Sequence, residues 1–450
     1  MRGTWALAAL AMAGGLAGCD DDGAPRAHFA GGGRLRAQWW ELPGGVTLFR
    51  QFFDTARGEP CQFDGLLGPS GLDRCLPLAH VELFRASVTD FADPACTEPA
   101  IAVVGTTLPS VVVELPDDAC AGEPAVFGLG PELTSHYRRD PGGACVPATT
   151  RSFYRVGSPL PLDRFVGAAA VVEPTGDRIA GYTLTTGDGA RQVIGGWDRD
   201  RDERVAESPE LAADRWTPRG IAYAFGATFA DPACTRPVAQ KLGDSAVCPI
   251  TTVLGAGGAH VAGPAVDPRS LFGHDGAGAC VATPIDRDDL RFVEVGAPIA
   301  IDALAPLPTV DHGTDRVHRR DAASPDGTPI LPRSTSPLFD TATGQPCDIR
   351  VATDGVPRCL PQRFDGGYFA DAACTRPLVQ ASQPPALVSI DTGAPARFAV
   401  HPVGAPFTDA TIHVAGAAGC AAVTRGDGVE YFALGDARAP TDFVAALAHD

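Results

Sequence analysis

The chain has 450 residues, including 52 Gly, 41 Pro and 13 Cys, and its formal net charge at pH 7 is −18. Gly and Pro make up about a fifth of the chain, and this share excludes an all-α bundle or a coiled coil because both residues break helices. Hydrophobic residues at 45% exclude a wholly disordered chain. The negative charge argues against nucleic acid or anionic lipid as a partner, since both bind basic faces.

Residues 1–18 have the features of an export signal: a basic Arg2, an apolar run over residues 5–13 and small residues after it. The run is shorter than the ~20 apolar residues of a membrane span. The last signal residues and Cys19 read Leu-Ala-Gly-Cys, which resembles the bacterial lipobox and implies that Cys19 is lipid-modified after cleavage. An ordinary signal peptide with a chance cysteine is the alternative. Residues 19–33 are acidic and Gly-rich, and we expect a short tether there.

Three near-copies of one nine-residue segment mark an internal repeat. The segment Phe-Ala-Asp-Pro-Ala-Cys-Thr-Glu-Pro at 91–99 recurs with small changes at 229–237 and 369–377. A second site, small-small-Cys, follows in each copy at Cys145, Cys280 and Cys420. The sequence therefore predicts three repeats of about 140 residues, over 34–170, 171–312 and 313–450.

Short apolar runs between turn residues predict strands throughout these repeats. Runs of four to seven residues lie between Asp-Gly, Gly-Gly and Pro-containing segments, and helical periodicity is hard to find after the leader. We therefore predict an all-β fold. One arrangement is a six-bladed β-propeller with two blades per repeat, and the alternative is a row of small β domains.

The repeats also predict how the cysteines pair. The first copy has Cys61 and Cys75 and the third has Cys347 and Cys359, whereas the middle copy lacks both, as joint loss of a disulfide predicts. The third copy otherwise holds only two cysteines, so we expect Cys374–Cys420 and, by repetition, the pairs Cys96–Cys145 and Cys234–Cys280. Cys120 and Cys248 stay unresolved: they could bond each other, remain thiols, or change the assignment through Cys96–Cys120.

The serine-hydrolase elbow, the metalloprotease motif His-Glu-x-x-His and the phosphate-binding loop are all absent, so we nominate no catalytic residue and expect no cofactor. One acidic segment, with Asp198, Asp200 and Asp202 alternating with arginines, is a weak calcium candidate because carboxylates at alternate positions open a calcium loop. Glu203 stands where such a loop needs Gly, and the arginines would pair with the carboxylates. Exposed ion pairing is the favoured alternative.

The motifs Asp-Thr-x-x-Gly-x-Pro-Cys, Arg-Cys-Leu-Pro and Phe-Ala-Asp-x-x-Cys-Thr-x-Pro occur together with the lipobox. This combination resembles uncharacterised myxobacterial-type lipoproteins that carry a cysteine-containing repeated domain of unknown function. The middle copy departs from the pattern by losing one cysteine pair.

From these features we expect an exported protein anchored in the cell envelope, at the outer membrane or at the periplasmic face of the inner membrane. We expect it to meet the membrane through its N-terminal lipid and to act as a non-enzymatic binding or structural module. An envelope protein or a glycan is the expected partner. The alternative is a carbohydrate-active hydrolase or lyase on a propeller-like scaffold, an expectation that depends on fold-level analogy alone.

Overall fold

The computed structural model describes residues 28–449 except for short gaps at 64–71, 85–87, 104–107, 116–122, 141–142, 149–151, 208–214, 225–226, 241–249, 256–257, 286–289, 314, 335–336, 365, 394–395, 417–418 and 427. The leader, Cys19 and most of the tether therefore lie outside the described residues, as do Cys120 and Cys248. Within the described residues, no helix is long and apolar enough to span a membrane.

The all-β prediction is confirmed, since the described elements are strands apart from four short 3-10 turns. These turns are η2 (Leu162–Arg164), η3 (Pro268–Ser270), η4 (Ile301–Ala303) and η5 (Pro440–Asp442).

The first half of each copy folds into a meander of four antiparallel strands, as the alternation of apolar runs and turn residues predicts. The strands of the first copy are β2 (Leu35–Glu41), β3 (Thr47–Asp54), β4 (Glu59–Phe63) and β5 (Leu72–Pro77). The second copy has β15 (Ile179–Thr186), β16 (Arg191–Asp198), β17 (Glu203–Glu207) and β18 (Trp216–Pro218). The third has β28 (Val317–Ala323), β30 (Leu338–Asp340), β31 (Gln345–Val351) and β32 (Pro357–Pro361). Two short strands, β1 (Phe29–Ala30) and β29 (Pro329–Pro332), pair with β16 and β28.

The three meanders are joined into a closed ring by the last strand of each copy. These strands are β14 (Gly167–Val172), β27 (Thr309–His312) and β41 (Leu447–His449). β14 pairs with β15 of the second copy, β27 with β28 of the third, and β41 returns to pair with β2 of the first. β14 also pairs with β5 of its own copy. In the other two copies an isolated bridge joins the chain just before the closing strand to the end of the meander, Pro306 to Arg215 and Ala445 to Arg358. The C-terminal strand therefore closes the ring.

The second half of each copy forms an outer module of eight strands. The first module has β6 (His80–Phe84), β7 (Asp90–Phe91), β8 (Ala100–Ala102), β9 (Val111–Leu115), β10 (Ala125–Glu132), β11 (His136–Arg139), β12 (Cys145–Ala148) and β13 (Phe153–Leu160). The second has β19 (Ile221–Tyr223), β20 (Thr228–Phe229), β21 (Val238–Gln240), β22 (Thr252–Gly255), β23 (Gly258–Val266), β24 (Phe272–His274), β25 (Cys280–Ala282) and β26 (Phe292–Pro298). The third has β33 (Arg363–Phe364), β34 (Tyr368–Phe369), β35 (Pro377–Gln380), β36 (Leu387–Asp391), β37 (Phe398–Phe407), β38 (Thr411–Gly416), β39 (Gly419–Thr424) and β40 (Tyr431–Leu434).

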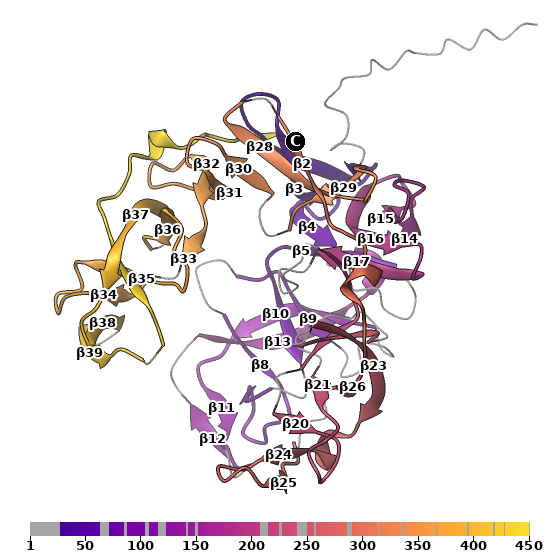
Figure 1. The fold of residues 1–450 in the computed structure, drawn as a ribbon, viewed down its shortest axis with the longest axis vertical. Helices are drawn as coiled ribbons and strands as arrows, with labels where there is room; N and C mark the ends of the chain where they lie inside the picture. The colour runs from indigo at the N-terminus through magenta and orange to yellow at the C-terminus, as the bar shows by residue number, and fades with distance from the viewer. Residues whose placement is uncertain are drawn as a thin grey trace, which may run out of the picture.

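Each outer module begins with a parallel strand pair: β6 with β9, β19 with β22, and β33 with β36. In the second module five strands close into a small barrel, because β19 also pairs with β21. In the third module the equivalent strands β33 and β35 do not pair with each other, and the five strands form an open sheet. Figure 1 shows the third module on the left of the view, apart from the other two modules below.

Three buried clusters fill the ring, one at each junction between copies. The first includes Phe52, Phe63 and the second copy's Leu184, and the second includes Trp216 together with Ile330 of the third copy. The third joins Leu338 to Leu42 of the first copy. The described sheets do not divide into the six separate blades of a propeller, so that arrangement is not confirmed, whereas the alternative of small β domains is compatible with the outer modules.

Candidate functional site

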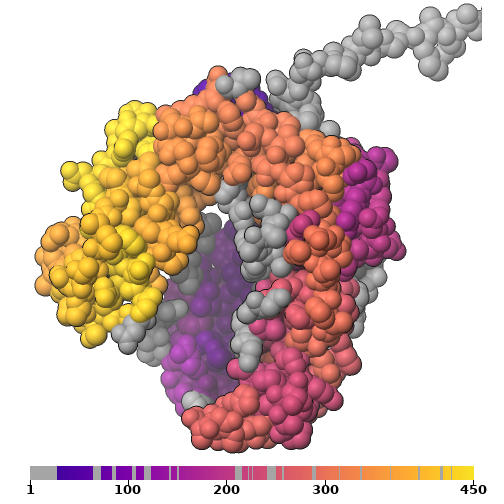
Figure 2. Space-filling model, in the orientation of Figure 1, coloured from indigo at the N-terminus to yellow at the C-terminus, as the bar shows by residue number. Residues whose placement is uncertain are grey.

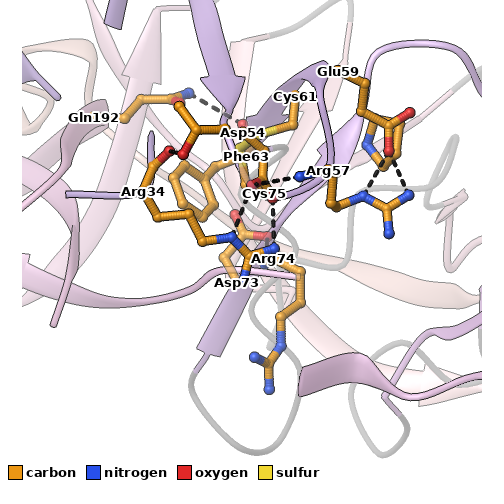
Figure 3. Close-up of a disulfide and its surroundings, with 12 residues drawn as sticks. Arg34, Asp54, Arg57, Glu59, Cys61, Phe63, Asp73, Arg74, Cys75 and Gln192 are labelled. Atoms are coloured by element: carbon orange, nitrogen blue, oxygen red, sulfur yellow. Dashed lines mark hydrogen bonds and ion pairs between the residues drawn. A yellow bond between two sulfur atoms is a disulfide. The ribbon is translucent and has the colours of Figure 1, made fainter. Parts of the chain in front are cut away.

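An arginine–aspartate pair holds the start of each meander. Arg34 donates two hydrogen bonds to Asp54, at 2.8 and 2.7 Å, and the same bidentate pair recurs in the third copy between Arg316 and Asp340, at 2.7 and 2.6 Å. The aspartates are 0% and 1% exposed. Hydrogen bonding to the carboxylate raises the pKa of each arginine. Figure 3 shows the first of these pairs beside the Cys61–Cys75 disulfide.

In the middle copy this pair contains one residue of the calcium candidate. The Asp198 carboxylate, 1% exposed, accepts from Arg178 Nε and Nη2 at 3.1 and 2.9 Å and from the backbone N–H of Asp200 at 3.0 Å. Asp200 lies 3.2 Å from the same guanidinium. Among the described residues no group of three His, Cys, Asp or Glu side chains is placed to hold a metal ion. The structure therefore gives Asp198 and Asp200 an arginine partner.

Asp202, the third residue of the calcium candidate, is distinguished by its backbone conformation in the same turn. Its φ is +53°, a left-handed conformation that side chains rarely adopt. The equivalent positions in the other copies are Gly58 and Gly344, with φ of +70° and +66°. Asp202 therefore occupies a position that favours glycine, and the segment 198–203 is a tight turn between β16 and β17.

Three further arginines hold the 3-10 turn that precedes each closing strand. Arg74, Arg215 and Arg358 each donate from Nη1 to the carbonyl oxygen of the residue after the turn, at 3.3, 3.3 and 2.7 Å. The accepting residues are Phe165, Leu304 and Phe443, which are almost fully buried. The residues that recur in all copies of the ring thus have structural partners.

The structure contains the five disulfides expected from the repeats: Cys61–Cys75, Cys96–Cys145, Cys234–Cys280, Cys347–Cys359 and Cys374–Cys420. Disulfides persist in oxidising compartments, so these bonds indicate an extracytoplasmic location.

Val205 and Trp216 take the place of the missing disulfide in the middle copy. Both are 1% exposed and belong to the same buried cluster. Trp216 Nε1 donates a 2.9 Å hydrogen bond to the carbonyl oxygen of Ala323 in the third copy. The tryptophan therefore fills the volume of the cystine and also ties the second copy to the third.

Each outer module carries a tight turn closed by a disulfide. In the first, the Asp93 carboxylate accepts from the backbone N–H groups of Thr97 and Glu98 at 2.9 and 2.6 Å, and Cys96 has a φ of +54°. The same bonds recur around Asp231 and Asp371, and Cys234 and Cys374 have φ of +50° and +52°. These hydrogen bonds lower the pKa of all three carboxyls.

The third module contains a cavity of about 560 Å³ at the seam where its sheet stays open. β33, the residues after it and its hydrogen-bonded neighbour β36 line one part of the cavity, and the paired strands β34, β35 and β40 line another. The lining residues are Arg363, Gly366, Gly367, Phe369, Pro377, Leu378, Ile390, Asp391 and Leu434. In the space-filling view, this module borders a hollow in the surface that separates it from the other two (Figure 2).

The cavity combines apolar walls with two opposite charges. Phe369, Leu378, Ile390 and Leu434 supply the apolar area. Arg363 is exposed, and its guanidinium carbon lies 5.7 Å from the centroid of the Phe398 ring. The Asp391 carboxylate accepts from the backbone N–H of Gly393 at 3.0 Å. Such a site can bind a ligand through one apolar face and several polar groups.

None of the residues that line the cavity was predicted from the sequence to be a site residue. Phe369 belongs to the repeated motif, but its motif equivalents Phe91 and Phe229 gave no reason to select the third copy. The lining residues come from five strands, and the arrangement of strands in space is not visible in a motif. The arginine–aspartate pairs, by contrast, are indicated by the sequence, because Arg34 and Asp54 are separated by twenty residues, as are Arg178 and Asp198.

Residues 251–444 match the model of a family of unknown function, DUF7481. The match begins at β22 and includes the third meander and the third outer module with its cavity. Searches of curated proteins and of solved structures found no match. The chain is therefore similar, over less than half of its length, to a family to which no activity is assigned.

Proposed function

We propose that the protein is a lipid-anchored module of the cell envelope that binds a glycan in the cavity of its third outer module. The observation that carries the proposal is the position of this cavity, in the seam between β33 and β35. Ligand pockets are typically concave and apolar with a few convergent polar groups, and this cavity has that composition. The lipobox-like leader, with Cys19 as the proposed lipid attachment site, supports a location at a membrane surface.

A glycan fits the chemistry of the lining. A sugar ring has an apolar face that packs against aromatic and aliphatic side chains, here Phe369 and Leu378. Its hydroxyl groups both donate and accept, so that Asp391 can accept from one hydroxyl while Arg363 donates to another. The repeated residues of the ring, by contrast, stabilise turns and junctions, so we expect the third outer module to bind the ligand.

The test is a calorimetric titration of the full mature chain with a panel of soluble oligosaccharides that includes chitotriose and maltotriose. We expect one member to bind the wild type and to bind Phe369→Ala at least ~10-fold more weakly, since truncating a stacking aromatic removes about 1.5 kcal/mol or more. The matched control is Phe229→Ala, the same motif position in β20 of the second module, whose five-stranded sheet is closed into a barrel, and this variant should bind like the wild type.

Two outcomes would contradict this proposal. Equal loss of binding in both variants would mean that Phe369 acts through the fold and not through the cavity. Release of reducing ends from the oligosaccharide by the wild type, abolished in Asp391→Asn, would instead support the hydrolase.

The lipid anchor has its own test. Cells that express the wild type or Cys19→Ala would be labelled with radioactive palmitate. We expect the label to be incorporated only in the wild type, and equal incorporation in both would refute lipidation at Cys19.

A further inference from the structure

Two arginines lie directly opposite each other on the hairpin formed by β17 and β18. Val205 is paired with Pro218, and the next position brings Arg204 opposite Arg219, whose backbone N–H donates to the carbonyl oxygen of Arg204 at 2.9 Å. Directly opposite residues of an antiparallel pair project to the same face of the sheet. Both arginines are partly buried. The two guanidinium groups therefore share one face, opposite the face on which Val205 enters the core.

The fold does not require arginine at either position. The equivalent pair in the first copy is Pro60 and Leu78, and the same backbone hydrogen bond joins them at 3.2 Å. In the third copy the pair is Pro346 and Gln362. Two copies thus build this hairpin with uncharged side chains, and the positive pair is specific to the middle copy.

The two arginines repel each other electrostatically. Like charges directly opposite each other destabilise a strand pair. Burial, followed by the charge of Arg219, lowers the pKa of Arg204 to about 10, although Tyr182 and Asp73 act in the opposite direction. Burial also lowers the pKa of Arg219. Within the described part of the chain, Arg219 forms no ion pair with a carboxylate. Both groups are still charged at neutral pH.

Aromatic side chains lie beside the pair on the same face. The guanidinium carbon of Arg204 lies 4.9 Å from the centroid of the Tyr182 ring, and Trp197 is the cross-strand partner of Arg204 on β16. The Tyr182 and Trp197 rings are stacked, with centroids 5.7 Å apart. Arg204 is positioned by its contact with the Tyr182 ring and by the hydrogen bond that its Nη2 donates to the carbonyl oxygen of Ile194 at 3.4 Å.

We propose that Arg204 and Arg219 form a binding site for a small oxyanion, such as inorganic phosphate or the phosphate group of a soluble ester. Two guanidinium groups on one face supply several donors, which suit the three or four oxygens of a phosphate. A dianion between them removes their mutual repulsion in a partly desolvated setting. This site lies in the meander of the second copy and is independent of the cavity in the third module.

The test is a calorimetric titration of the full mature chain with inorganic phosphate and, in parallel, with glycerol phosphate, both in chloride buffer at constant ionic strength. We expect saturable binding to the wild type and binding at least ~10-fold weaker to Arg219→Gln, the residue that the third copy carries here. Stronger binding of inorganic phosphate would identify a site for the free anion, and stronger binding of glycerol phosphate a site for an ester. The matched control is Arg36→Gln, which removes one exposed positive charge from β2.

Two results would overturn the proposal: no saturable heat with either probe, or equal affinity in the wild type and in Arg219→Gln. A second measurement guards against a folding defect. Because the substitution removes repulsion, the Tm of Arg219→Gln in chloride should equal or exceed that of the wild type, and phosphate should raise the Tm of the wild type and of Arg36→Gln only. A lower Tm in chloride would contradict the argument that the pair is unfavourable without an anion.

Discussion

At the residue scale, the three copies separate side chains that the fold needs from side chains that it does not. Positions occupied by the same residue type in every copy, such as Arg34 and Asp54 with their equivalents, hold a turn or a junction. Positions where one copy differs carry the distinctive features, among them Arg204 and Asp202. The shared positions therefore stabilise the fold, and the fold does not require the residues in which one copy differs.

Gly344 should be sensitive to substitution for a reason that lies in the backbone alone. Its φ is +66°, and a methyl group there would meet no atom within 4 Å. We expect Gly344→Ala to lower the free energy of unfolding by about 1 kcal/mol, the cost of a left-handed alanine. Chemical denaturation would measure it. Gly187→Ala, at an equally open position without positive φ, is the control, and an equal loss there would contradict the explanation.

Asp198 should be one of the least replaceable carboxylates. Asp198→Ala leaves Arg178, 20% exposed, without its main acceptor, and we expect a loss of about 3 kcal/mol in the free energy of unfolding. Asp302, 92% exposed and 3.5 Å from Arg215, is the control, and its replacement by Ala should change stability by less than about 0.5 kcal/mol. If Asp198→Ala also leaves stability unchanged, the buried pair does not hold the turn.

At the element scale, each outer module depends on a turn whose aspartate must be ionised. The folded-state pKa of Asp93, Asp231 and Asp371 lies below the ordinary value of 3.8, first because of hydrogen bonds from Glu98 N–H, Arg236 N–H and the Thr375 hydroxyl, respectively. A lowered pKa contributes stability that is fully present above the unfolded value and is lost as pH falls through the folded value. The turns should therefore weaken below about pH 4.

We predict that the Tm falls less between pH 6 and pH 2.5 in the triple variant Asp93→Asn/Asp231→Asn/Asp371→Asn than in the wild type. The amide accepts hydrogen bonds but does not titrate in this range. The control Asp409→Asn/Glu430→Gln/Asp436→Asn replaces three exposed acids and should follow the wild type. If the triple turn variant shows the same acid response as the wild type, the three carboxyls are not the acid-sensitive groups.

The middle meander should accept the disulfide that it lacks. The Cα atoms of Cys61–Cys75 and Cys347–Cys359 are 5.3 and 5.2 Å apart, and Val205 and Trp216 occupy the equivalent positions. We expect Val205→Cys/Trp216→Cys to form the bond when exported, which intact mass measurement would detect as two hydrogens fewer than the dithiol. The single variant Val205→Cys controls for thiol exchange. Two free thiols in the double variant would show that the middle meander has a different geometry.

At the scale of the whole molecule, the sequence predicted the all-β class and the five described disulfides, because motifs at equal spacing carry that information. It proposed a closed arrangement only as a six-bladed propeller, and it did not predict a ring of three meanders. Closure depends on β41 pairing with β2, whose residues are separated by about four hundred positions and share no motif. The cavity was missed for a similar reason, since its lining combines residues from β33, β34, β35, β36 and β40. Both features are consequences of tertiary geometry.

The central claim, that the protein binds a ligand in the open seam of the third module, is tested most directly by hydrogen–deuterium exchange on the full mature chain. The exchange would be compared with and without the tightest-binding oligosaccharide of the panel. We predict slower exchange in Pro377–Gln380 and Leu387–Asp391, the strands that line the cavity. Unchanged exchange in the equivalent strands Val238–Gln240 and Thr252–Gly255 of the second module is also predicted. Protection confined to the second module, or absent from both, would contradict the account.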